Sequence, residues 1–122
     1  VESKDHLFLT DGKAKVLMAD NENKPLVTVN EFGKGKGIYL ASFQQDLENT
    51  RMLYHLIRYA GGEGTSGVYM TDNLYTECAY YPENKKLVII NNSDVEQTTT
   101  VPTEKGDVTV TIAPYDTTFV EM

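Results

Sequence analysis

Gly61-Gly62-Glu63-Gly64-Thr65-Ser66-Gly67 divides the chain into two parts whose apolar residues follow different periods. Four of these seven residues are glycine, and none has a large apolar side chain that could anchor a core. Before this segment the apolar runs lead into one helical pattern, whereas after it apolar residues recur at every second position. We therefore predict the tail of one domain at residues 1–62, a Gly-rich linker at 63–67 and a complete β domain at 68–122.

The helical pattern spans about Leu47 to Ala60, directly before the Gly-rich segment. Its apolar residues recur at helical spacing and form one stripe, made of Met52, Leu53, Leu56, Ile57 and Ala60. Asp46 or Asn49 can cap its start, and Gly61-Gly62 suits a left-handed end. A helix with one apolar face has to cover a sheet, which the preceding strands are expected to form.

Three strands are predicted before the helix, at residues 14–19, 26–32 and 38–43. The second and third flank Gly33-Lys34-Gly35-Lys36-Gly37, so we expect an antiparallel hairpin in which glycine supplies a positive φ. The alternative for this run is an anion-binding loop, because glycine and lysine together can cradle phosphate. A phosphate-binding loop leads into a helix, whereas a strand follows here, and this favours the hairpin.

Five strands are predicted after the Gly-rich segment, at residues 74–81, 87–91, 95–101, 108–112 and 117–121. Short strands at this spacing are typical of a small antiparallel sandwich or barrel-like module. The predicted fold class is therefore mainly β (α+β): antiparallel strands with one covering helix, followed by a small C-terminal antiparallel β sandwich.

Charge and composition exclude several classes of partner. Asp and Glu outnumber Lys and Arg by 18 to 11, giving a net charge of −7 that opposes binding to nucleic acid and anionic membranes. The sequence contains no apolar run near the ~20 residues that cross a bilayer. Its start at Val1 lacks the features of a secretory signal and an initiator Met, which predicts a processed or excised piece of a longer protein. The lone thiol of Cys78 fits a reducing compartment, so the expected location is cytoplasmic.

The cysteine and the histidines give no sign of a reactive or metal-binding site. Cys78 is the single cysteine, and it has no cationic neighbour in sequence to lower its pKa, so we expect it to be buried in a strand. His6 and His55 have no Cys or carboxylate at the spacing of a zinc site. We therefore predict no metal and no cofactor in this chain, and we place His55 at the solvent edge of the helix.

Carboxylates and serines are equally unpromising as catalytic groups. Glu77 and Glu83 could be nominated as a glycosidase pair, but such a pair flanks a sugar cleft, and one residue is expected in a strand and the other in a turn. Ser42, Ser66 and Ser93 lack the glycines of a nucleophile elbow. No residue of the chain is therefore predicted to be catalytic.

The tyrosines are the most informative candidates for binding. The chain has 8 Tyr, 4 Phe and no Trp, and Tyr69, Tyr75, Tyr80 and Tyr81 cluster on neighbouring β positions. Exposed tyrosines on a sheet can stack on sugars or form a protein interface, and Tyr75, Tyr80 and Tyr81 are the candidate contacts. The competing interpretation is that these rings pack in a core or between domains, with the hydroxyl at the edge.

Three stretches together resemble one known family. They are Val29-Asn30-Glu31-Phe32-Gly33-Lys34-Gly35-Lys36-Gly37-Ile38-Tyr39-Leu40-Ala41-Ser42-Phe43, then Glu48-Asn49-Thr50-Arg51-Met52-Leu53, and Glu77-Cys78-Ala79-Tyr80-Tyr81-Pro82-Glu83 with Lys86-Leu87-Val88-Ile89-Ile90-Asn91-Asn92-Ser93. In this order they resemble the C-terminal part of the lacto-N-biose/galacto-N-biose phosphorylases (1,3-β-galactosyl-N-acetylhexosamine phosphorylases). The first stretch also resembles the end of the amidotransferase-like domain of certain β-galactosidases. The third stretch is the one that favours the phosphorylases over these β-galactosidases.

The resemblance implies a catalytic (β/α)₈ barrel elsewhere, a middle domain similar to class I glutamine amidotransferases and a small C-terminal β domain. Residues up to about 62 would end the middle domain. The family cleaves β-1,3-galactosyl-N-acetylhexosamines with phosphate, with inversion, to α-galactose 1-phosphate. Its catalytic groups lie chiefly in the barrel, so the resemblance assigns none here.

The expected role is therefore structural or accessory, within a parent enzyme that is a homodimer by analogy. The alternatives are a carbohydrate-binding β module and the C-terminal part of a β-galactosidase-type hydrolase. A truncated middle domain would also leave sheet edges unpaired, which favours pairing between copies.

Overall fold

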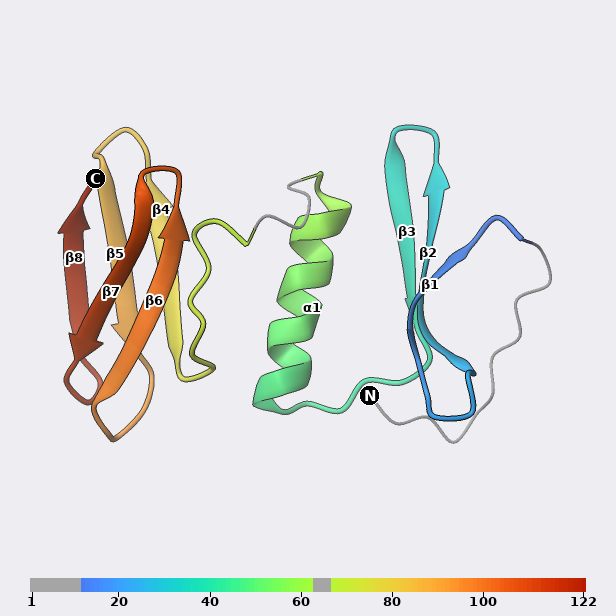
Figure 1. Ribbon diagram of the computed structural model, residues 1–122, viewed down its shortest axis with the longest axis horizontal. Helices are drawn as coiled ribbons and strands as arrows, with labels where there is room; N and C mark the ends of the chain where they lie inside the picture. The colour runs from blue at the N-terminus through green and yellow to red at the C-terminus, as the bar shows by residue number, and fades with distance from the viewer. Residues whose placement is uncertain (1–11, 63–66) are drawn as a thin grey trace. The chain divides into compact units, whose positions relative to one another are not determined.

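The computed structural model describes residues 12–62 and 67–122 (Figure 1). The chain divides into two compact units, Val1–Thr65 (unit 1) and Ser66–Met122 (unit 2), and each is described on its own. Strands dominate both units and there is one α-helix in the described ranges, so the predicted mainly-β fold class is confirmed. Within those ranges, no helix has the length and apolar character needed to cross a membrane.

Unit 1 contains a three-stranded antiparallel sheet in the order β1-β2-β3. Its strands are β1 (Lys15–Ala19), β2 (Pro25–Phe32) and β3 (Gly35–Leu40). The predicted hairpin is confirmed, because β2 pairs with β3 out to Phe32 opposite Gly35, and Gly33 in the turn has φ 60°. The predicted bounds of β3 were wrong. Gly35 and Gly37 are themselves in the ladder, and the strand ends at Leu40 instead of continuing to residue 43.

The helix α1 (Leu47–Ala60) has the bounds that its apolar period predicts. Asp46 is the N-cap, and its carboxylate accepts a 2.8 Å hydrogen bond from the backbone N–H of Asn49. At the other end Gly62 takes φ 91°, and the N–H of Gly61 donates to the carbonyl of Ile57. The helix lies against β3, yet none of its residues is buried in this chain.

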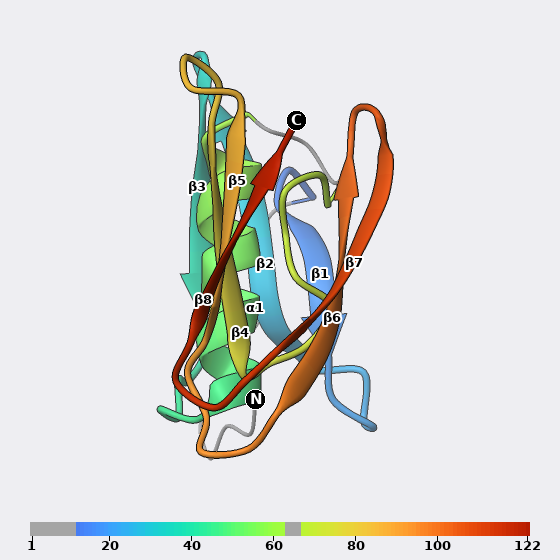
Figure 2. The same ribbon diagram turned by 90° about the vertical axis from the view of Figure 1, so that its left-hand side faces the viewer.

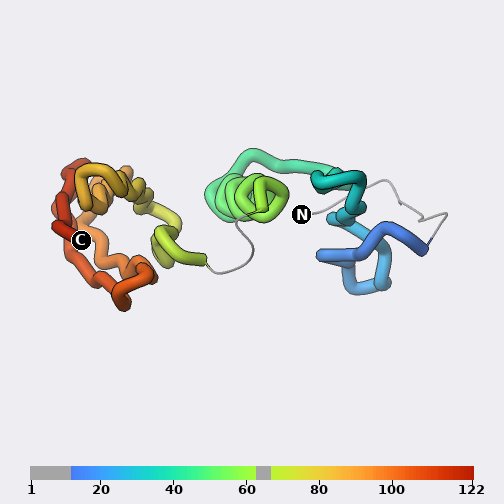
Figure 3. Tube along the Cα trace, turned by 90° about the horizontal axis from the view of Figure 1, so that it is seen from above, coloured from blue at the N-terminus to red at the C-terminus, as the bar shows by residue number. Residues whose placement is uncertain are grey.

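Unit 2 is an antiparallel two-layer module. One layer is a sheet in the order β4-β5-β8, and the other is the hairpin β6-β7 (Figure 2). The strands are β4 (Thr76–Tyr81), β5 (Lys86–Asn91), β6 (Gln97–Thr103), β7 (Gly106–Ile112) and β8 (Thr117–Glu121). Seen along the strands in Figure 3, the two layers face each other and enclose the core.

The core of unit 2 is formed by alternate residues of both layers. Leu87 and Ile89 from β5 meet Val101 from β6 and Ile112 from β7, and all four have at most 1% of their surface exposed. Partly buried side chains pack around them, namely Tyr69, Cys78, Tyr80, Val108, Val110, Val120 and Met122. Four residues of this size remove most of their apolar surface from water, which is the main stabilising contribution in such a small unit.

Two strands of unit 2 start later than the sequence predicts. The predicted strand 74–81 starts at Thr76, because the side chain of Asn73 accepts a hydrogen bond from the N–H of Tyr75 and forms a turn there. The predicted strand 95–101 starts at Gln97, because the carbonyl of Val95 accepts hydrogen bonds from side chains instead of a neighbouring strand. Side-chain hydrogen bonds to the backbone therefore set both boundaries.

Candidate functional site

The cysteine packs against a core, and the helical histidine is exposed. Cys78 is half-buried on β4 and packs against the core of unit 2. His55 is exposed on α1, where partial burial lowers its pKa and the positive charges of Arg51 and Arg58 act in the same direction. His6 lies outside the described residues. Across the described ranges, no group of three or more His, Cys, Asp and Glu residues is placed to hold a metal ion.

The carboxylates and serines considered above do not form a catalytic arrangement. Glu77 is exposed on the outer face of β4 and Glu83 is exposed in the following turn, so the two do not flank a cleft in the described part of the chain. Ser93 is buried and its hydroxyl donates to the side chain of Asn91 at 2.8 Å. Ser42 follows β3 with a half-buried side chain, and Ser66 lies outside the described residues.

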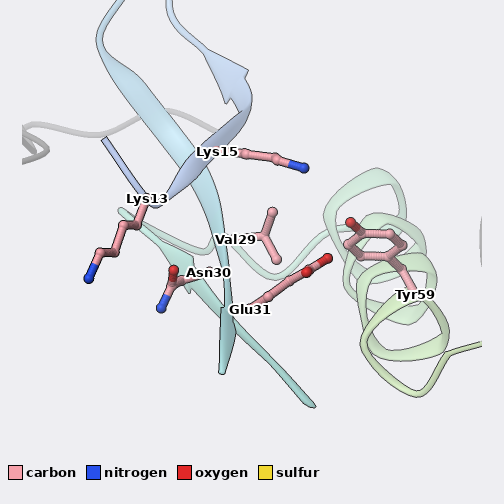
Figure 4. Close-up of a pocket in the computed structure, with 6 residues that line it drawn as sticks. All are labelled: Lys13, Lys15, Val29, Asn30, Glu31 and Tyr59. Carbon is pink, nitrogen blue, oxygen red and sulfur yellow. The ribbon is translucent and has the colours of Figure 1, made fainter. Parts of the chain in front are cut away.

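An open cleft of about 290 Å³ lies between the sheet and the helix of unit 1 (Figure 4). Its lining residues are Lys13, Lys15, Val29, Asn30, Glu31 and Tyr59. In Figure 4 the side chains of Lys15, Glu31 and Tyr59 point toward the space between sheet and helix, whereas Lys13 and Asn30 point elsewhere. Charges of both signs therefore meet in an open space, which is a poor arrangement for selecting an anion.

The Gly-rich run beside this cleft does not form the alternative anion-binding loop. Gly35 and Gly37 lie in β3 opposite Phe32 and Asn30, so this backbone belongs to the sheet ladder and forms no phosphate cradle. Lys36 lies with its ammonium nitrogen 5.2 Å from the centre of the Tyr59 ring, a cation–π contact between β3 and α1. These interactions serve packing within unit 1.

The three candidate tyrosines do not share one surface. Tyr80 points toward the core opposite Leu87, and its ring stacks on Tyr69 with centroids 4.3 Å apart and planes 8° apart. Tyr75, which directly precedes β4, and Tyr81, its last residue, are exposed at 48% and 52%. Successive strand residues point to opposite faces, so Tyr80 and Tyr81 are separated by the sheet itself.

The outer face of the sheet β4-β5-β8 carries a further aromatic residue that sequence reasoning missed. Phe119 of β8 is 66% exposed and lies opposite Val88 of β5, which in turn lies opposite Ala79 of β4. We call the outward residues of these strands the aromatic face: Glu77, Ala79, Tyr81, Lys86, Val88, Ile90, Thr117, Phe119 and Glu121. The alternation of Phe119 with core-facing Val120 was the available signal for this position.

The side-chain amide of Asn91 links the end of β5 to neighbouring segments by hydrogen bonds. Its nitrogen donates to the carbonyls of Val95, Ile112 and Ala113 at 2.8, 3.1 and 3.0 Å, and its oxygen accepts from the N–H and the hydroxyl of Ser93. Asn91 is 1% exposed, so these bonds form away from water. The side chain thereby joins β5 to the two loops that lead into and out of the hairpin β6-β7.

Comparison with protein families matches both units. Residues 1–65 match the family described as the lacto-N-biose phosphorylase central domain, and residues 69–120 match the lacto-N-biose phosphorylase C-terminal domain. The two matches follow each other along the chain and are separated only by residues of the Gly-rich segment and its immediate neighbour.

Individual relatives are named as phosphorylases of galactosyl disaccharides. The chain is 45% identical to D-galactosyl-β-1→4-L-rhamnose phosphorylase of Lachnoclostridium phytofermentans over 95% of its own length and 16% of that protein. It is 34% identical to a 1,3-β-galactosyl-N-acetylhexosamine phosphorylase of the same organism, over 82% of the chain and 14% of the relative. A 1,3-β-galactosyl-N-acetylhexosamine phosphorylase of Bifidobacterium longum is 34% identical over 75% of the chain and 12% of its own length.

Proposed function

Because the chain belongs to the lacto-N-biose phosphorylase family, we propose that it is the non-catalytic C-terminal part of a phosphorylase that cleaves a β-galactosyl disaccharide. In this reaction phosphate attacks the anomeric carbon of galactose, the glycosidic C–O bond breaks, and the leaving oxygen takes a proton from a general acid. The products are α-galactose 1-phosphate, formed with inversion, and the released acceptor sugar. The consecutive central-domain and C-terminal-domain matches are the observation that supports this proposal.

A non-catalytic role is supported by what the described residues lack. Inverting cleavage needs a general acid beside a cleft that holds the disaccharide and phosphate together. Glu77 and Glu83 are exposed on a sheet face and in a turn, and charges of both signs line the open cleft of unit 1. The groups that act on the substrate would then belong to the remainder of the parent enzyme.

The burial pattern suggests a different role for each unit. In unit 1, Phe32, Ile57 and Leu47 are 85%, 60% and 49% exposed, which is a high exposure for large apolar side chains near one sheet and helix. We propose that the preceding part of the parent's central domain covers them. Unit 2 has its own core and would serve as a closed accessory module attached to that domain.

The acceptor sugar is proposed from the difference in similarity among the relatives. Identity to the galactosyl-rhamnose phosphorylase is 45%, against 34% and 30% for two N-acetylhexosamine phosphorylases of the same organism. This favours β-1,4-galactosyl-L-rhamnose as the substrate of the parent. The β-1,3-galactosyl-N-acetylhexosamines, lacto-N-biose and galacto-N-biose, are the second candidates.

The experiment compares the 122-residue chain with its parent enzyme. Each is incubated with phosphate and galactosyl-rhamnose, lacto-N-biose or galacto-N-biose, and galactose 1-phosphate is measured. We expect release by the parent and none by the chain. Turnover by the chain alone would overturn the non-catalytic role. Release of free galactose by the parent without phosphate would instead indicate a β-galactosidase-type hydrolase.

A further inference from the structure

We propose that the aromatic face of unit 2 binds a β-galactoside, with one sugar stacked on Tyr81 and another on Phe119. The choice of galactose among sugars rests on the proposed function, whereas the existence of the surface rests on the sheet itself. The sequence pointed to Tyr75, Tyr80 and Tyr81. The structure removes Tyr80, which is partly buried and stacks on Tyr69 against the core, and adds Phe119.

The register of the sheet places the two aromatic residues on either side of β5. Tyr81 lies opposite Lys86, and Phe119 lies opposite Val88, two residues further along the same face of β5. By the standard spacings of an antiparallel sheet, the Cα atoms of Tyr81 and Phe119 are about 12 Å apart. Lys86 and Val88 of β5 lie between them, so a ligand that contacts both rings would cross β5 at these two residues.

The chemistry of this face suits a pyranose. A sugar ring has apolar C–H surfaces that pack on an aromatic ring, and in galactose the axial 4-hydroxyl leaves one of these surfaces continuous. Polar groups must then fix the hydroxyls at the edge of the sugar. Lys86, which lies opposite Tyr81, forms an ion pair at 3.4 Å with Glu121 of β8, and together they supply both donors and acceptors.

Area and charge favour a small neutral ligand over a second copy of the chain. Three strands of about six residues present roughly 14 by 20 Å, or about 300 Å², whereas a stable protein interface buries about 800 Å² on each partner. Residues 67–122 contain nine Asp and Glu and three Lys, so this module has a charge of −6. A second module would bring the same charge against it, whereas a disaccharide is not repelled.

The test is a ¹H–¹⁵N NMR titration of the 122-residue chain with methyl β-D-galactopyranoside and with lactose, against methyl β-D-glucopyranoside. We expect saturable shifts in β4, β5 and β8 with an affinity on the order of 1 mM, as befits a shallow site. Tyr81→Ala and Phe119→Ala should each weaken binding about fivefold to tenfold. Tyr115→Ala, which removes a 72% exposed tyrosine from the turn between β7 and β8, is the matched control and should bind as the unmodified chain does.

Several outcomes would overturn the inference. They are no saturable shift at tens of millimolar ligand, equal binding of the glucoside, and equal weakening by Tyr115→Ala. A fourth is self-association in sedimentation that Phe119→Ala abolishes, because the face would then be a protein interface. Spectra of the variants establish that they fold. The phosphorolysis assay of the parent does not depend on this face, so failure of sugar binding here leaves the proposed function to its own test.

Discussion

Units 1 and 2 are of similar length and both contain antiparallel strands, but they differ in which elements bury apolar residues. In the described part of unit 1 the buried apolar side chains, Leu26, Val27 and Val29, all lie on β2. In unit 2, Leu87, Ile89, Val101 and Ile112 from opposite layers are at most 1% exposed. In unit 1 the helix α1 has a clear apolar stripe and a fixed N-cap, yet none of its residues is buried. An amphipathic pattern therefore specifies a helix and its apolar face, whereas burial of that face needs a second surface of matching size.

Polar side chains show the same contrast. In unit 2 the buried amide of Asn91 and the carboxylate of Asp72 hold separate segments together, with Asp72 accepting from the hydroxyl of Thr99 and the N–H of Thr100. In the described part of unit 1 the hydrogen bonds that the carboxylates of Asp20 and Asp46 accept are local, from backbone N–H groups two to four positions away. Unit 2 thus combines an apolar core with polar side chains that link segments far apart in the sequence. Mutation can test each of these two contributions to stability.

The largest effect is expected from Asn91→Asp. A carboxylate would replace the amide nitrogen that donates to three backbone carbonyls, and it would place negative charge in a site that is 1% exposed. We expect the free energy of unfolding of unit 2 to fall by about 4 kcal/mol, from lost hydrogen bonds and a buried unpaired charge. This free energy is measured by urea unfolding, in which the NMR signals of unit 2 report its folded fraction.

Asn92→Asp makes the same chemical change at the next, exposed position and is the control. It should change the free energy of unfolding by less than about 0.5 kcal/mol. Equal stability of the two variants would show that the amide of Asn91 does not join the loops as described.

Leu87→Ala and Ile57→Ala test the contrast between the units directly. Leu87 is fully buried, so its truncation should lower the free energy of unfolding of unit 2 by about 3 kcal/mol through lost burial and a residual cavity. Ile57 is 60% exposed, so Ile57→Ala should change the stability of unit 1 in this chain by less than about 0.5 kcal/mol. Both changes in the free energy of unfolding are measured by urea unfolding, with NMR signals assigned to each unit.

The effect of Ile57→Ala can also be compared between this chain and the parent enzyme. If the preceding part of the central domain covers α1, Ile57→Ala should destabilise the parent's central domain by clearly more than it destabilises unit 1 alone. A similar small effect in both proteins would contradict the proposed cover.

Local features of the fold were predictable from sequence because their signals are local. The helix bounds follow from the apolar period together with Asp46 and Gly61-Gly62, and the hairpin follows from Gly33. The starts of β4 and β6 depend on hydrogen bonds between a side chain and nearby backbone: Asn73 accepts from the N–H of Tyr75, and Asn91 donates to the carbonyl of Val95. The apolar period carries no information on such bonds, and it placed both starts two residues too early.

The candidate site was predicted only in part. Tyr75 and Tyr81 are exposed, whereas strand alternation turns Tyr80 to the opposite face from Tyr81, and the tyrosine cluster in the sequence obscured this separation. Phe119 is brought beside β5 by pairing of β8 with residues about thirty positions earlier, a long-range contact that no local period specifies. Residue types indicated the kind of surface, and the sheet register decided its members.

Removal of the N-cap should have a moderate effect confined to unit 1. Asp46→Ala deletes the carboxylate that accepts from the N–H and the amide group of Asn49, each at 2.8 Å. We expect the helix to lose about 1 kcal/mol of stability, seen as fraying of its first turn in hydrogen exchange and circular dichroism. Asp46→Asn keeps a capping oxygen and should restore most of the protection. An unchanged exchange rate in Asp46→Ala would mean that the cap contributes nothing.

The smallest effect concerns pH, and it also separates the units. Partial burial lowers the pKa of His55 in the folded chain, and Arg51 and Arg58 act in the same direction, so the neutral form is favoured by folding. The resulting stability is present above the unfolded pKa of about 6.5 and is lost as pH falls through the folded value. Helical signal in unit 1 should therefore weaken slightly between pH 7.5 and pH 5, on the scale expected of a single exposed histidine near neutrality.

In the control variant His55→Gln this loss of helical signal should disappear, while unit 2 is unaffected. The same pH dependence in His55→Gln would place its origin elsewhere, and stronger protection of the helix at low pH would reverse the sign of the argument.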